Sequence, residues 1–284
     1  YSLMNSRFKI VLWGIMTFAM TCGFLHHFIK PEILNFERLH IFLFNLCSGG
    51  TLLIYFTEGH KRLSGNGIIF LLFSVAFAIC AFMHWYGPTL VIPLLLATII
   101  ERVRVARFGS RIPKALFSAK ESTSRKFHQA SLLCLSLSLM LSSPVIFNSE
   151  YGHWLTIEKL KLDTFFLGFS FPISLISMSV IFELMHRAKK PIIRYLKTIS
   201  FWFINLGVII FFFFILAKWF VPQVIIATIL FVTVSLILYL YRYHGIRLQQ
   251  KAFLTSGILF LVVTSITGII YIFLVFSDSY DPQK

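Results

Sequence analysis

The sequence FWFINLGVIIFFFFIL occupies residues 201–216 and contains no charged side chain. It is the centre of an apolar segment at 195–218, which is long enough for one helix to cross a lipid bilayer. Other segments also meet or approach the required length of about 20 mostly apolar residues: 8–29, 39–56, 67–86, 88–101, 129–148, 162–184, 220–241 and 252–276. The sequence therefore predicts an all-α, polytopic bundle of about nine transmembrane helices.

The composition of the chain agrees with this fold class. Of its 284 residues, 57% are hydrophobic and only 13% are charged, whereas soluble domains carry roughly 25% charged residues. So few charges cannot cover a water-exposed surface, and the 33 phenylalanines fit contact with lipid. The composition excludes an ordinary soluble enzyme and a disordered or fibrous chain.

The distribution of basic residues predicts the orientation. If the N-terminus is cytoplasmic, 20 of the 26 Lys and Arg residues fall in cytoplasmic segments, as the positive-inside rule requires. Trp85, Trp154 and Trp219 then lie at outer helix ends, where an aromatic belt is expected. We therefore expect the N-terminus inside and the C-terminus outside. Because the chain begins with Tyr1 rather than Met, we expect the native N-terminus to lie ahead of it.

The formal charge of +15 has the same explanation, so it does not indicate a nucleic-acid partner. The longest basic stretch, 102–128, is predicted to be a cytoplasmic loop. Its expected partners are anionic membrane lipids or another subunit.

The segments group into one extra helix and two four-helix units, at 8–29, 39–148 and 162–276, within one transmembrane domain. The segments at 39–56 and 162–184 both have small residues in the middle, and each leads to a glutamate and a basic loop with a histidine. This similarity suggests an internal duplication. The alternative is that small residues are there because membrane helices pack closely through them.

Four histidines are the candidate cofactor-binding residues. Three neighbouring helices should bring them to one depth near the outer side: His26, His27, His40 and His84. Facing imidazoles at this depth suit a quinone, which needs hydrogen-bond donors and a nearby base, or a b-type haem, which needs axial ligands. The alternative is that they are interfacial histidines without a ligand.

Five ionisable residues at inner helix ends are candidates for proton entry or subunit docking: Glu58, His60, Glu101, Glu183 and His186. The alternative is that they form solvated or salt-bridged helix ends. We assign no catalytic or metal-ligating residue, because the sequence contains no nucleotide-binding, nucleophile-elbow or zinc-protease motif. The four cysteines lack CxxC spacing and are expected to be small buried hydrophobes.

Two stretches of the sequence resemble the membrane subunits of respiratory oxidoreductases of the NrfD/PsrC type. Phe42–Tyr55, with Ser48, Gly49 and Gly50, is similar to the first helix of that family, and Phe165–Phe182 is similar to its fifth. The loop Gly109–Phe117 resembles its Arg-Pro loop, although Ile112 separates the two residues and the loop follows a different helix. The resemblance implies a quinone-interacting subunit without haem, partnered by an iron–sulfur protein.

We therefore expect an integral membrane subunit of a quinone-linked respiratory electron-transfer complex in a prokaryotic inner membrane. It would be a non-autonomous part of an oxidoreductase, supplying the quinone and proton site and anchoring redox partners. The alternatives are a small secondary transporter, suggested by the interrupted segments 39–56 and 162–184, and the membrane anchor of a sensor or multisubunit assembly.

Overall fold

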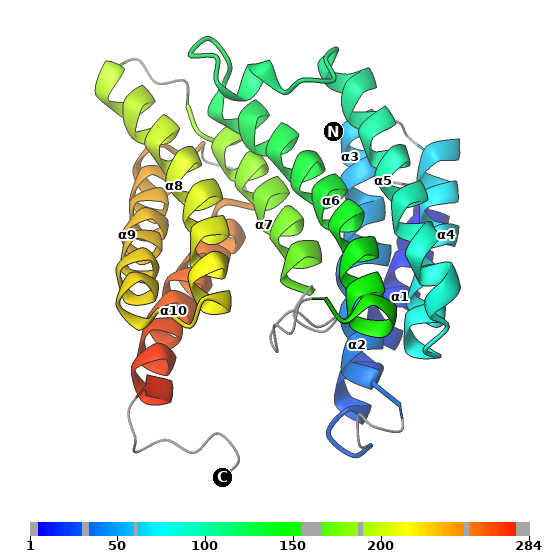
Figure 1. The fold of residues 1–284 in the computed structure, drawn as a ribbon. Coiled ribbons are helices and arrows are strands. Elements are labelled where there is room, and N and C mark those ends of the chain that lie inside the picture. The colour runs from blue at the N-terminus through cyan, green and yellow to red at the C-terminus, as the bar shows by residue number, and fades with distance from the viewer. Residues whose placement is uncertain are drawn as a thin grey trace. The chain divides into compact units, whose positions relative to one another are not determined.

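The computed structural model describes residues 5–29, 34–59, 62–154, 166–186, 190–246 and 250–276. Within these ranges the chain is helical, and its only β-type pairing is an isolated bridge between Met185 and Gly245. The elements are α1 (Ser6–Leu25), α2 (Phe36–Ile41), the π-helical η1 (Phe42–Gly50), α3 (Thr51–Glu58), α4 (Gly65–Phe82), α5 (Tyr86–Phe108), η2 (Lys114–Leu116), α6 (Thr123–Phe147), the π-helical η3 (Asn148–Gly152), α7 (Phe166–Glu183), α8 (Pro191–Leu216), α9 (Phe220–His244) and α10 (Gln250–Phe276) (Figure 1).

The described part of the chain has seven helices that are long and apolar enough to cross a membrane. One of them is the continuous helix that runs from α2 through η1 to α3, and another is α6 together with η3. The other five are α1, α4, α8, α9 and α10. The prediction of an all-helical protein is confirmed, and the helices are compatible with an integral membrane protein. The other two predicted segments fall on α5 and α7. The count of nine crossings and the orientation stay predictions.

The predicted basic loop 102–128 is wrong at both ends. Helix α5 continues to Phe108, and α6 already begins at Thr123, so the connection is shorter. Arginines are good helix formers, and the Glu101–Arg104 pair lies one turn apart on α5. The helix ends only where Gly109 adopts a positive φ of 72°, a conformation that glycine accepts without strain.

The chain divides into two compact units. Unit 1 contains residues 1–119 and 128–177, and unit 2 contains residues 120–127 and 178–284. Their boundary within α7 does not coincide with the predicted groups 39–148 and 162–276. The internal duplication remains a prediction.

Unit 1 is packed around the continuous helix from α2 through α3. The Phe42 ring lies edge-on to Phe77 of α4 and to Phe169 of α7, with centroids 4.9 and 5.5 Å apart. The adjacent Gly49 and Gly50 admit large neighbours, because Ile173 lies against Gly49 and the Phe70 ring would be 2.7 Å from a Cβ at Gly50. The small residues of this segment therefore serve close helix packing, which was the alternative to duplication.

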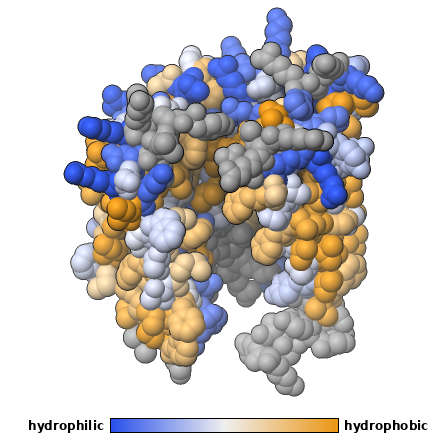
Figure 2. All heavy atoms as spheres, turned by 180° about the vertical axis from the view of Figure 1, so that it is seen from behind, coloured by the Kyte–Doolittle hydropathy of each residue, from blue (hydrophilic) through white to orange (hydrophobic). Residues whose placement is uncertain are grey.

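Unit 2 contains α8, α9 and α10 as successive neighbours. Leu230 of α9 fills the space beside Gly207 of α8. The ends of α7 and α9 are joined where the amide of His186 donates to the carbonyl of His244 at 2.9 Å. On the face drawn in Figure 2, hydrophilic side chains gather at one end of each unit, and hydrophobic side chains cover much of the remainder.

Candidate functional site

Unit 1 places a histidine–glutamate–histidine group where α1 ends and α2 begins; we call His26, Glu37 and His40 the α1–α2 polar cluster. Asn35 starts α2, since its Oδ1 accepts a 2.8 Å hydrogen bond from the amide of Arg38. This cap places Glu37 in the first turn, where the helix dipole favours a negative charge. His40 follows three residues later and so lies on the same helix face.

His26 and Glu37 connect the two helices. The Nε2 atom of His26 lies 3.6 Å from Oε2 of Glu37, which is an ion pair when the imidazole is protonated. The other ring nitrogen, Nδ1, is buried and has no hydrogen-bond partner among the described residues. A buried polar atom without a partner costs about 1–3 kcal/mol. Its position therefore suits a ligand or a water molecule.

His40 is held in a defined state by α1. Its Nδ1 atom lies 2.7 Å from the carbonyl oxygen of Ala19. Because a carbonyl only accepts, Nδ1 carries the proton, and Nε2 of the neutral ring is left as an acceptor. Gly23 makes room for this ring, since a Cβ there would lie 2.9 Å from Nδ1 of His40. The α1–α2 polar cluster thus contains the His26–Glu37 pair and, on the helix face of Glu37, a second imidazole that α1 orients.

The start of α2 also meets the end of α4. Arg38 is buried, and its Nη1 donates to the carbonyl of Ala81 at 3.2 Å. The rings of Phe36 and Phe82 lie edge-on, 5.3 Å apart. These contacts bring the ends of α1 and α4 and the start of α2 to one end of unit 1.

The remaining two outer histidines have local contacts. The ring of His27 is exposed and lies 5.6 Å from that of His26. His84 is exposed, has a positive φ of 58°, and hydrogen-bonds through Nδ1 to the hydroxyl of Tyr86 at 2.8 Å. The structure therefore groups His26 and His40 through α1 and α2, while His84 pairs with its own neighbour in sequence.

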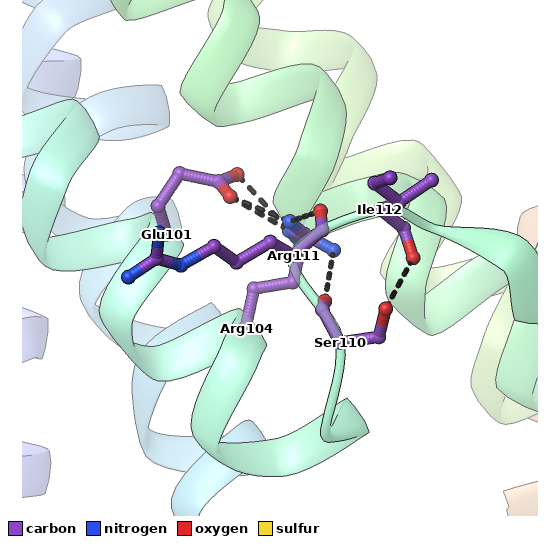
Figure 3. A network of polar contacts seen from close by, with 5 residues as sticks. All are labelled: Glu101, Arg104, Ser110, Arg111 and Ile112. Carbon is purple, nitrogen blue, oxygen red and sulfur yellow. Dashed lines mark hydrogen bonds and ion pairs between the residues drawn. The ribbon is translucent and has the colours of Figure 1, made fainter.

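Among the inner candidates, Glu101 belongs to a buried arginine network (Figure 3). The Nε atom of Arg104 is 3.0 Å from both carboxylate oxygens of Glu101. Its Nη2 atom donates to Glu101 and to the carbonyl of Arg111, both at 2.6 Å. Arg104 is only 1% exposed. The network holds the loop after α5 against the helix. Glu101 therefore fits the alternative interpretation, a salt-bridged helix end.

The other described inner candidates belong to different units, Glu58 to unit 1 and Glu183 and His186 to unit 2. Glu58 ends α3, and its Oε1 accepts a 2.9 Å hydrogen bond from Asn66, while its Oε2 is buried without a partner among the described residues. Glu183 and His186 are exposed at the end of α7. His60 lies outside the described residues.

Sequence reasoning missed three polar residues of unit 1. Glu37 could have been found, because the sequence Glu37–His40 places both ends on one helix face. Thr57 and His128 are far apart in sequence, yet the Nε2 of His128 lies 2.8 Å from the Thr57 hydroxyl. Since that hydroxyl donates to the carbonyl of Leu53, it accepts from His128. No pattern in the local sequence predicts such a pair.

Comparison of the chain with models of known protein families, with curated proteins and with solved structures found no match. Within the residues that the structure describes, no group of three or more His, Cys, Asp or Glu side chains is arranged to hold a metal ion. The functional argument therefore depends on the geometry of unit 1.

Proposed function

We propose that this chain is a membrane-embedded subunit of a quinone-linked electron-transfer complex, and that the α1–α2 polar cluster is its quinone and proton site. The observation that carries the proposal is the buried, unpartnered Nδ1 atom of His26 beside Glu37. Reduction of a quinone takes up electrons and protons in equal number. A protonated imidazole can donate to a quinone carbonyl, and a neighbouring carboxylate can resupply the proton.

In this proposal each residue has a distinct role. His26 donates the hydrogen bond to the quinone oxygen, and Glu37 restores its proton from water, since the carboxylate is half exposed. His40 offers Nε2 as an acceptor for a hydroxyl of the reduced quinol, because Ala19 holds the proton on Nδ1. Electrons come from a redox partner subunit, for which the resemblance to NrfD/PsrC-type proteins suggests an iron–sulfur protein.

The wider setting belongs to the same proposal. The chain crosses a prokaryotic inner membrane nine times, with its N-terminus inside, so that the α1–α2 polar cluster faces the outer side. Anionic lipids and the other subunits of the complex are its partners. The charge distribution of the sequence supports this orientation.

The test is binding of decylubiquinone to the purified chain in lipid nanodiscs. We expect His26→Ala to weaken binding by about tenfold, the equivalent of one charge-assisted hydrogen bond, and Glu37→Gln to weaken it less, because Glu37 acts through His26. His40→Ala should weaken binding of the reduced form, decylubiquinol, whose hydroxyl groups can donate to Nε2. His27→Ala is the matched control, because His27 is exposed and adjacent to the site. If the wild type and all three variants bind equally, these histidines are interfacial residues without a ligand.

A secondary transporter is the second candidate function. It is favoured by the π-helical segment Phe42–Gly50, because such segments are frequent at functional sites, and by Pro172 within α7. Against it, Ile173 and Phe70 occupy the space beside Gly49 and Gly50, where a substrate would bind. Uptake of a solute by the purified chain in liposomes, without a redox partner, would favour the transporter.

A further inference from the structure

Unit 2 contains two buried lysines that have no carboxylate within ion-pair distance among the described residues, although Glu121 attracts Lys126 from further away. Lys126 in the first turns of α6 is 4% exposed, and Lys197 in the second turn of α8 is 8% exposed. Lysines are almost never this buried unless they are paired. Among the described residues, no carboxylate lies within ion-pair distance of either ammonium, and the nearby Glu121 pairs with Arg125 at 3.6 Å.

Lys126 approaches an aromatic side chain of α8, the helix that carries Lys197. The Nζ atom of Lys126 lies 6.0 Å from the centroid of the Phe201 ring. Lys197 precedes Phe201 by four residues on α8 and so shares its helix face. Phe127, next to Lys126, packs edge-on against Phe201 at 5.1 Å. Both lysines thus belong to the surroundings of Phe201 in unit 2, and the burial of each ammonium costs free energy.

The hydrogen-bonding capacity of both ammonium groups is largely unused. An ammonium has three donors. Lys197 donates to the carbonyl of His186 at 3.1 Å, and Lys126 makes the cation–π contact but no hydrogen bond within the described part of the chain. The positive ends of the α6 and α8 dipoles lie within two turns of these lysines. All of these features favour an anion.

We propose that Lys126 and Lys197 bind a phosphate-class anion at this end of unit 2. A phosphate group presents several acceptor oxygens and enough charge for both lysines. The lysines lie in the first two turns of two candidate membrane spans, and the ends of such spans are where lipid phosphates are expected. The anion is either a free phosphate or the headgroup of an anionic lipid, and the two share the same chemistry.

The experiment uses the purified full chain in two settings. In detergent, thermal unfolding is compared between inorganic phosphate and chloride at equal ionic strength. In nanodiscs, retention of phosphatidylglycerol is compared with that of phosphatidylcholine by native mass spectrometry. Stabilisation by phosphate identifies a free anion, whereas selective retention of phosphatidylglycerol alone identifies a lipid headgroup.

The variants separate this site from the general surface charge. We expect Lys126→Met and Lys197→Met to weaken binding about tenfold or more, because each removes a charge-assisted hydrogen bond. Lys190→Met is the matched control, since it removes an exposed lysine of the same unit. Lys126→Arg keeps the charge and should keep the binding.

Two results would overturn the proposal. In one, phosphate stabilises the wild-type chain no more than chloride does, and the chain retains phosphatidylglycerol no better than phosphatidylcholine. The other is a Lys190→Met variant that loses as much binding as the two buried-lysine variants. The wild-type comparison decides the question even if a methionine variant does not fold.

Discussion

Two glycines of α1 have opposite surroundings, and they show how one residue positions a histidine. Gly23 lies against the ring of His40, whereas nothing lies within 4 Å of a Cβ placed at Gly14. Gly23 therefore has to be small because of its neighbour, whereas Gly14 does not. The hydrogen bond from His40 to Ala19 depends on that space.

We expect Gly23→Ala to lower the free energy of unfolding by about 1–2 kcal/mol, because the added methyl displaces the His40 ring. Gly14→Ala is the matched control and should raise stability by about 0.5–1 kcal/mol, the ordinary gain of alanine within a helix. Thermal unfolding in detergent measures both. Equal stabilisation by the two substitutions would show that Gly23 does not hold His40.

Among the described residues, Arg104 is the most deeply buried of the charged side chains. We expect Arg104→Met to destabilise the chain by about 2–3 kcal/mol, because it leaves Glu101 and the carbonyl of Arg111 without a donor. Arg104→Lys should recover only part of this, since an ammonium cannot bind a carboxylate through two nitrogens. The exposed Arg102→Met is the control. Denaturation midpoints as low for Arg102→Met as for Arg104→Met would contradict this role.

At the scale of elements, the central helix of unit 1 depends on Gly49 and Gly50. Each lies against a side chain from a different helix, Ile173 of α7 and Phe70 of α4. In lipid, exclusion of water does not drive helices together, so close packing supplies much of the association energy.

We expect Gly49→Leu and Gly50→Leu each to cost about 1–3 kcal/mol through overpacking. Gly14→Leu adds the same side chain where there is open space and should cost much less. Thermal stability in detergent distinguishes them. If all three variants match the wild type, the glycine face of this helix does not form a packed seam.

Length and apolar composition predicted the all-helical fold, because a run such as residues 201–216 has few alternatives in lipid. The end of α5 was not predicted, because its polar arginines are typical of a loop. Arg104 is nevertheless buried, in a network whose partners come together only in the folded chain. The histidines of α1 and α2 were predicted as candidates from their expected depth, which stays a prediction. Their partners, the Ala19 carbonyl and the Gly23 surface, carry no sequence signal.

At the scale of the whole molecule, each unit turns large apolar side chains outward. On α1 of unit 1, Trp13 is 75% exposed, and on α10 of unit 2, Phe253 is 77% exposed. Soluble monomers rarely expose apolar surface on this scale. These faces are compatible with lipid contact, and the positive-inside rule then predicts which ends lie in the cytoplasm.

Cysteine labelling tests this orientation at the two ends of α6. Ala119 and Glu150 are exposed and lie on either side of the predicted segment 129–148. Arg102, Arg107, Arg111 and Lys114 precede Ala119, so the positive-inside rule predicts that end to be cytoplasmic. We expect Ala119→Cys to react with an impermeant maleimide only after the membrane is opened, and Glu150→Cys to react in intact cells. The wild-type chain controls for its own cysteines, of which Cys22 and Cys47 are buried. Labelling of both positions in intact cells would show that this segment does not cross the membrane, and the reverse pattern would invert the orientation of the chain.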